Sequence, residues 1–80
     1  MQVLKQKTLK CRTGLKQKRF ILRIIERDDH SIVFCVESRG FLDQDNNRAF
    51  TICTNKDKAL ELFDQEYSRI IRNERITSIY

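Results

Sequence analysis

The chain has 80 residues, of which 40% are hydrophobic, and its 16 Lys and Arg residues outnumber its 11 Asp and Glu residues to give a formal net charge of +5. This length supports one small domain, residues 1–80, with a modest core and too little material to enclose a deep active-site cavity. No apolar run is long enough for a transmembrane helix, and the start of the chain lacks a signal-peptide pattern, so we expect no membrane association.

The positive charge is concentrated in the first third of the chain. Residues 1–27 carry nine basic side chains and one acid, a net charge of +8, whereas residues 28–80 carry seven basic and ten acidic side chains, a net charge of −3. This polarity favours a polyanionic partner, with nucleic acid ahead of a membrane surface. The alternative is a solvated pair of basic strands that keeps the domain soluble.

The three cysteines, Cys11, Cys35 and Cys53, stand far apart in the sequence. They predict buried free thiols in a reducing, cytoplasmic compartment. A zinc site from these residues and His30 would need paired ligands in tight turns, and no C-x-x-C or H-x-x-x-H spacing is present. We therefore expect no metal and no cofactor.

The first half of the chain predicts three strands. Val3–Cys11 is weakly patterned and fits an extended edge strand that ends at Thr13-Gly14. Phe20–Ile25 and Ser31–Val36 alternate apolar side chains, and the polar segment Glu26–His30 between them is rich in the Asp residues that favour reversals. These two runs predict an antiparallel hairpin.

A polar loop and a fourth strand follow the hairpin. Gly40 permits a turn, and the loop continues through Asp43–Arg48. Its two acids begin like a calcium loop, but the Gly at the sixth position and the Glu at the twelfth are missing, so we expect no calcium. Ala49–Thr54 predicts a strand with Phe50 and Ile52 facing inward, or with the intervening residues inward instead.

One helix completes the predicted fold. Thr54 or Asn55 can act as its N-cap, and Asn73 is a plausible end. The helix has one apolar stripe at three- and four-residue steps: Ala59, Leu60, Phe63, Tyr67, Ile70 and Ile71. Residues 76–80 fold back as a short tail. The sequence thus predicts an α+β domain, a four-stranded antiparallel sheet with one C-terminal helix packed on one face.

The sequence shows no constellation for catalysis. His30 is the only histidine, and it lies in an Asp-rich turn, where solvation is a better explanation than general-base chemistry. No nucleophile motif of the G-x-S-x-G type occurs, and no phosphate-binding loop of the G-x-x-x-x-G-K-[ST] type occurs either. We expect a protein that is not an enzyme.

Binding of nucleic acid is the favoured function. Strand alternation puts Lys16, Lys18 and Phe20 on one side and Arg19 and Arg23 on the other, so that a row of cations follows a phosphate backbone. Six residues make up the predicted nucleic-acid site: Lys16, Lys18, Arg19, Arg23, Arg39 and Arg48. The strands lack the aromatic triplet of sequence-reading RNA-binding domains, so we expect contact with phosphates of DNA first, without sequence preference.

The order of these elements resembles a WGR domain. The parts that carry the resemblance are Phe20–Ile25, Ser31–Val36, the polar segment Glu37–Arg48, the strand Ala49–Thr54 with an inward Phe, the helix pattern Ala59, Phe63 and Tyr67, and the terminal Tyr80. The Trp-Gly-Arg signature itself is absent, and Ser38-Arg39-Gly40 occupies its neighbourhood. The resemblance implies nucleic-acid binding, notably at DNA ends, with Arg39 and Gly40 at the place of the signature.

A small protein-interaction or inhibitor module, for example one encoded by a phage or plasmid to bind a host protein, is the competing hypothesis. The chain has a basic first third and an acidic helix surface. An exposed edge strand, for which Val3–Cys11 is the candidate, recruits partners by strand addition or forms a homodimer.

Overall fold

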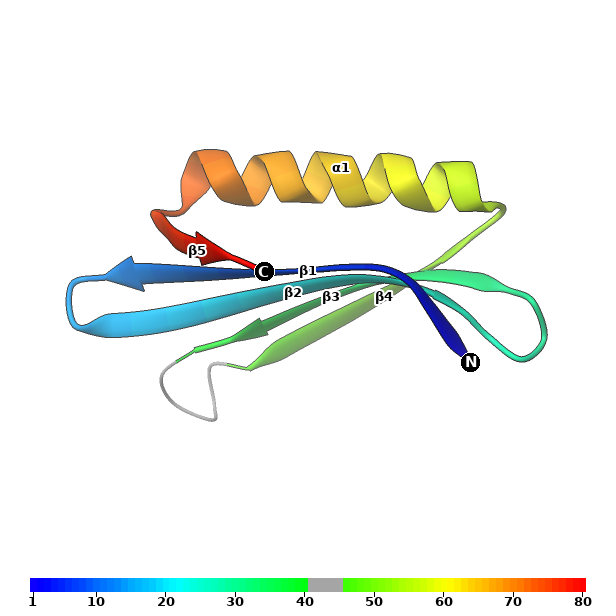
Figure 1. The fold of residues 1–80 in the computed structure, drawn as a ribbon, viewed down its shortest axis with the longest axis horizontal. Coiled ribbons are helices and arrows are strands. Elements are labelled where there is room, and N and C mark those ends of the chain that lie inside the picture. Colours follow the sequence, from blue (N-terminus) through cyan, green and yellow to red (C-terminus); the bar gives the residue numbers. More distant parts are fainter. Residues whose placement is uncertain (41–45) are drawn as a thin grey trace.

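The computed structural model describes residues 1–40 and 46–80. These residues form an α+β fold in which α1 lies over one face of an antiparallel sheet with the strand order β4-β3-β2-β1-β5 (Figure 1). The elements are β1 Gln2–Thr13, β2 Lys16–Glu26, β3 Ile32–Arg39, β4 Asn47–Cys53, α1 Lys56–Asn73 and β5 Ile76–Ile79. We call the side of the sheet under α1 the covered face and the opposite side the open face.

Local turn chemistry organises the first three strands. Gly14 has a φ of +63°, a left-handed conformation that glycine adopts without steric cost, and it reverses the chain between β1 and β2. The predicted hairpin is confirmed, because β2 and β3 pair in register from Arg19 opposite Arg39 to Glu26 opposite Ile32. Both strands are longer than predicted, so the basic segment 16–19 is part of β2.

The core lies between α1 and the covered face. Leu9, Leu22 and Ile24 of the sheet and Phe63 and Ile70 of the helix are fully buried. The core cluster as a whole is Leu9, Cys11, Phe20, Leu22, Ile24, Phe34, Cys53, Ala59, Phe63 and Ile70. Burial of side chains of this size supplies the main stabilisation of a domain this small.

The helix follows its predicted signals closely. The side chain of Asn55 accepts a hydrogen bond of 2.8 Å from the backbone N–H of Lys58, so Asn55 is the N-cap. The helix ends at Asn73, after which the N–H of Glu74 donates to the carbonyl of Ile70. The predicted apolar stripe is wrong at Ile71, which is 41% exposed on the outer side of the helix.

The prediction of four strands is wrong in number, because the C-terminal segment forms a fifth strand. β5 pairs antiparallel to β1, with Ile79 opposite Leu9 and Ser78 opposite Lys10. Backbone hydrogen bonds of 2.8 and 3.1 Å between Tyr80 and Thr8 extend this pairing. The segment is short and has weak alternation of its own, so its extended conformation depends on pairing with β1. The prediction of Val3–Cys11 as an edge strand is therefore wrong, because β1 lies between β2 and β5 in the sheet.

Of the two alternations that the sequence leaves open for β4, the one with Phe50 and Ile52 outward is correct, so the inward Phe of the WGR resemblance is not found. Phe50 and Ile52 lie on the open face and are 61% and 70% exposed, whereas Cys53 is buried on the covered face. Cys53 reaches the helix because Thr54 and Asn55 lead directly into α1. Of the predicted loop 43–48, residues 43–45 lie outside the described residues, and Asn47 and Arg48 belong to β4.

Candidate nucleic-acid interface

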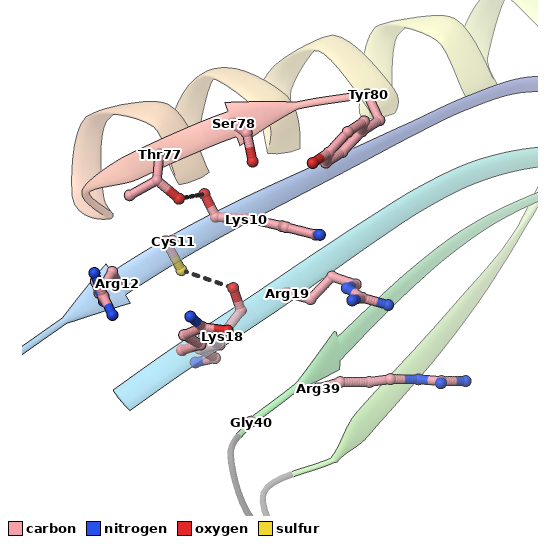
Figure 2. Close-up of a pocket in the computed structure, with 11 residues that line it drawn as sticks. Lys10, Cys11, Arg12, Lys18, Arg19, Arg39, Gly40, Thr77, Ser78 and Tyr80 are labelled. Carbon is pink, nitrogen blue, oxygen red and sulfur yellow. Dashed lines mark hydrogen bonds between the residues drawn. The ribbon is translucent and has the colours of Figure 1, made fainter. Parts of the chain in front are cut away.

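Three cations lie directly opposite one another across the open face. Lys10 of β1 pairs with Arg19 of β2, and Arg19 pairs with Arg39 of β3. Figure 2 shows these three side chains extending in the same direction from neighbouring strands. Ser78 of β5 continues the line beyond Lys10. We call Lys10, Arg19 and Arg39 the cationic row.

The positive charge of the cationic row is largely uncompensated. Residues directly opposite in an antiparallel sheet have Cβ atoms roughly 5 Å apart, and like charges in these positions repel. Among the described residues, no carboxylate forms an ion pair with Lys10 or Arg19, whereas Arg39 Nε lies 2.9 Å from Glu37 Oε1. The row therefore offers a site where a bound anion would relieve repulsion.

An open depression of about 550 Å³ adjoins the cationic row (Figure 2). The described residues that line it include no acid, and four of them are cations of the open face: Lys10, Arg12, Arg19 and Arg39. Lys18 also lines it, but its Nζ lies over Phe20 on the covered side. Thr77, Ser78 and Tyr80 of the C-terminal segment add hydroxyl groups. Such a set of donors and charges suits phosphate oxygens, which accept several hydrogen bonds.

A buried carboxylate holds the arginines beside the row. Glu37 is only 6% exposed, and its Oε1 accepts hydrogen bonds from Arg39 Nε at 2.9 Å and Arg48 Nη2 at 3.1 Å. Its Oε2 has no described hydrogen-bond partner and lies 3.6 Å from Arg23 Nη1. The hydrogen bonds from Arg39 and Arg48 lower the pKa of Glu37. One negative charge thus orients three arginines and leaves them net positive.

The open face brings together four of the six residues predicted as the site: Arg19, Arg23, Arg39 and Arg48. Lys18 has its Nζ 4.9 Å from the ring centroid of Phe20, on the covered side of β2, although it also lines the depression. Lys16 is exposed at the end of the β1–β2 hairpin, opposite Thr13. These two lysines therefore lie apart from Glu37 and the three arginines that contact it.

Lys10, Glu37 and Tyr80 belong to the site but were not predicted from the sequence. Lys10 alternates with Leu9 and Cys11, two fully buried residues, so the alternation within β1 did carry a signal for an outward cation. No comparable local signal exists for Tyr80, because its place depends on the pairing of β5 with β1.

Tyr80 presents an aromatic ring beside the cationic row. It is 65% exposed, and the Nζ of Lys10 lies 4.9 Å from its ring centroid. Hydrogen bonding with Ser78 and Lys10, together with the charge of Lys10, lowers the pKa of the Tyr80 phenol. An aromatic face and a cation are therefore available side by side to one ligand.

The cysteines are free and buried, as the sequence predicts. Burial raises the pKa of the Cys11 and Cys35 thiols, which favours their neutral, unreactive form. Within residues 1–40 and 46–80, no group of three or more His, Cys, Asp or Glu side chains is placed to hold a metal ion. In the same residues, no helix is both long and apolar enough to cross a membrane.

Comparison with known proteins adds no relative. No family model, no curated protein and no solved structure matches the chain. The resemblance to a WGR domain therefore stays a prediction, and function is inferred from the open face itself.

Proposed function

We propose that this domain is a non-enzymatic nucleic-acid-binding protein whose open face contacts the phosphate backbone. The observation that carries the proposal is the cross-strand register of Lys10, Arg19 and Arg39, which puts three cations in one line beside a depression without a described acid. Contacts with phosphates give affinity without reading the base sequence. The predicted resemblance to a WGR domain, which lacks both the Trp-Gly-Arg signature and the inward Phe of β4, implies the same function and singles out Arg39 of this row.

The sheet suits this role better than the helix does. The four basic side chains of α1 are balanced by four acidic ones, and Glu61 and Asp64 form ion pairs with Lys58 and Lys5, so the helix offers no net positive charge to a phosphate backbone. On the open face, Arg12 lies beyond the cationic row and Arg23 and Arg48 lie on its other side, so the positive surface extends along the strands. A backbone would therefore meet cations over several rows of the sheet.

A charge-matched comparison of variants tests the proposal. The triple variant Lys10→Gln, Arg19→Gln and Arg39→Gln removes three charges from the row, and we expect its affinity for DNA at low salt to fall roughly tenfold or more. The control variant Lys56→Gln, Lys58→Gln and Arg72→Gln removes three charges from α1, and we expect a much smaller loss. Anisotropy titration of labelled DNA measures both. Equal losses in the two variants, or no loss in either, would contradict the proposal.

A protein partner is the second candidate, and the exposed edge at β4 favours it. Phe50 and Ile52 are exposed on β4, which is an edge strand of the sheet. With Met1, Ile25 and Val33 they border a mainly apolar depression of about 390 Å³. Strand addition at β4 would form a homodimer or recruit another chain. Sedimentation at increasing protein concentration tests this candidate: association that resists salt and is lost in Ile52→Lys would support it.

A further inference from the structure

We infer that the nucleic acid bound on the open face is single-stranded, and that Tyr80 and Phe50 stack on its bases. This inference rests on the proposed function and specifies its ligand. The phosphates would contact the cationic row, and the two rings would stack on bases at the two edges of the open face.

The distribution of the aromatic side chains supports this inference. Among the described residues, Phe20, Phe34 and Phe63 are buried and Tyr67 is half-buried against the core. The only aromatic side chains of these residues that are largely exposed are Tyr80, at 65%, and Phe50, at 61%. Both lie on the open face, where the uncompensated cations also lie.

The two rings lie at opposite edges of the open face, with the strands that carry the cationic row between them. Tyr80 follows β5 and pairs with Thr8, in the row next to Lys10, Arg19 and Arg39. Phe50 of β4 lies opposite Cys35, in the row that contains Arg23. With neighbouring strands about 4.8 Å apart, the edges of a five-stranded sheet are roughly 19 Å apart. A short run of nucleotides across the strands would reach both rings beside the cationic row. Lys10 and Arg39 extend toward this path, as their contacts with Tyr80 and Glu37 show.

The contact between Lys10 and Tyr80 shows how one nucleotide would bind. Lys10 Nζ lies 4.9 Å from the ring centroid, so a phosphate held by Lys10 has an exposed aromatic ring within one nucleotide's reach. Single-strand binding proteins combine a basic track with such rings, because every base has a face that can stack. Bases in a duplex are already stacked on each other, and they would leave both rings without a partner.

Binding titrations with matched ligands test the inference. Labelled oligo(dT) and oligo(U) are compared with a DNA duplex of the same length, using the wild type, Tyr80→Leu, Phe50→Leu and the control Ile71→Ala on the outer side of α1. We expect single strands to bind more tightly than the duplex, each of the two ring-removing variants to lose roughly fivefold to 150-fold in single-strand affinity, and the control to be unchanged. The DNA and RNA arms show which strand the domain prefers.

The outcomes separate this inference from the function on which it rests. If the triple variant of the cationic row loses binding but the duplex binds as tightly as the single strands, or neither ring-removing variant matters, then the proposed function stands and the inference is wrong. If the wild type binds none of these nucleic acids, both are wrong.

A spectroscopic measurement tests the inference without removing a side chain. Incorporation of fluorotyrosine gives two ¹⁹F resonances, from Tyr67 against the core and from Tyr80 on the open face. We expect oligo(dT) to shift the Tyr80 resonance and to leave the Tyr67 resonance in place. Titration to saturation with an unmoved Tyr80 resonance would contradict stacking.

Discussion

The covered face and the open face are built from alternate residues of the same strands, but only the covered face packs against the helix. On β2, Leu22 and Ile24 are fully buried beneath α1. On the opposite side of the same strand, Arg19 is exposed and Arg23 is half-buried. The difference arises because side chains alternate across a strand and only one face has a helix over it. Stability should therefore depend mainly on the covered face, and binding on the open face.

The open face is not uniformly solvated. Four residues of its centre are buried: Ile21, Val33, Cys35 and Glu37. Long arginine side chains cover part of this centre, as the contacts of Arg39 and Arg48 with Glu37 show. The centre of the open face thus contributes to stability, while its basic end and its exposed aromatic rings remain free for a ligand.

The largest effect on stability is expected on the covered face. Leu22→Ala removes a fully buried side chain from the core, so we expect the free energy of unfolding to fall by about 2–5 kcal/mol. Denaturant unfolding measures this loss. DNA affinity, measured where the variant is still folded, should stay close to that of the wild type, and a selective loss of affinity would contradict the division between the faces.

A smaller loss is expected at the centre of the open face. Glu37→Gln keeps the shape of the side chain but weakens its hydrogen bonds with Arg39 and Arg48. We therefore expect the free energy of unfolding to fall by about 1–3 kcal/mol at neutral pH. Denaturant unfolding measures this change, and the exposed Glu61→Gln on α1 is the control, with little expected effect.

The pH dependence of Glu37 gives the same prediction a second test. The pKa of Glu37 is lowered in the folded state from its ordinary value of 4.5, so its contribution is fully present above that pH and is lost as the pH falls through the folded pKa. The difference in stability between the wild type and Glu37→Gln should therefore shrink in acid. A difference that is constant from neutral pH to well below 4.5 would contradict this role of the carboxylate.

The smallest effect on stability has the opposite sign. Arg19 lies between Lys10 and Arg39, so Arg19→Gln relieves repulsion on both sides and should stabilise the domain by about 0.2–1 kcal/mol at low salt. Thermal unfolding at low and high salt measures this gain, which should fade as salt screens the charges. A clear destabilisation would contradict this prediction, because it would show that packing of the Arg19 side chain outweighs its repulsion by Lys10 and Arg39.

The parts of the fold that follow local rules could be predicted from the sequence. The β2–β3 hairpin follows from alternation on either side of a polar turn, and the start of α1 follows from Asn55 as an N-cap. β5 was missed although three of its four residues are β-branched, because so short a run does not indicate a strand until β1 offers an edge. The inward face of β4 was equally undecided, since Phe50 is the larger residue but Cys53 is the one next to the helix.

The candidate site, like the fold, has parts that follow local sequence rules and parts that depend on pairing between distant segments. Arg19 and Arg23 were assigned to one face by alternation within a single strand, and the structure agrees. Lys10 and Tyr80 join that face only through the pairing of β1 with β2 and β5, which depends on register between segments far apart in the chain. Register of this kind has no local sequence signal, so the cationic row was visible only in part.

The salt dependence of binding tests the central claim most directly. The affinity of the wild type for a single-stranded oligonucleotide should fall linearly with salt on logarithmic axes, because bound phosphates release counterions. The triple variant Lys10→Gln, Arg19→Gln and Arg39→Gln should show a slope smaller by about 2, since each lost phosphate contact contributes about 0.7 on single strands. An equal slope in the wild type and the triple variant would contradict binding through the cationic row.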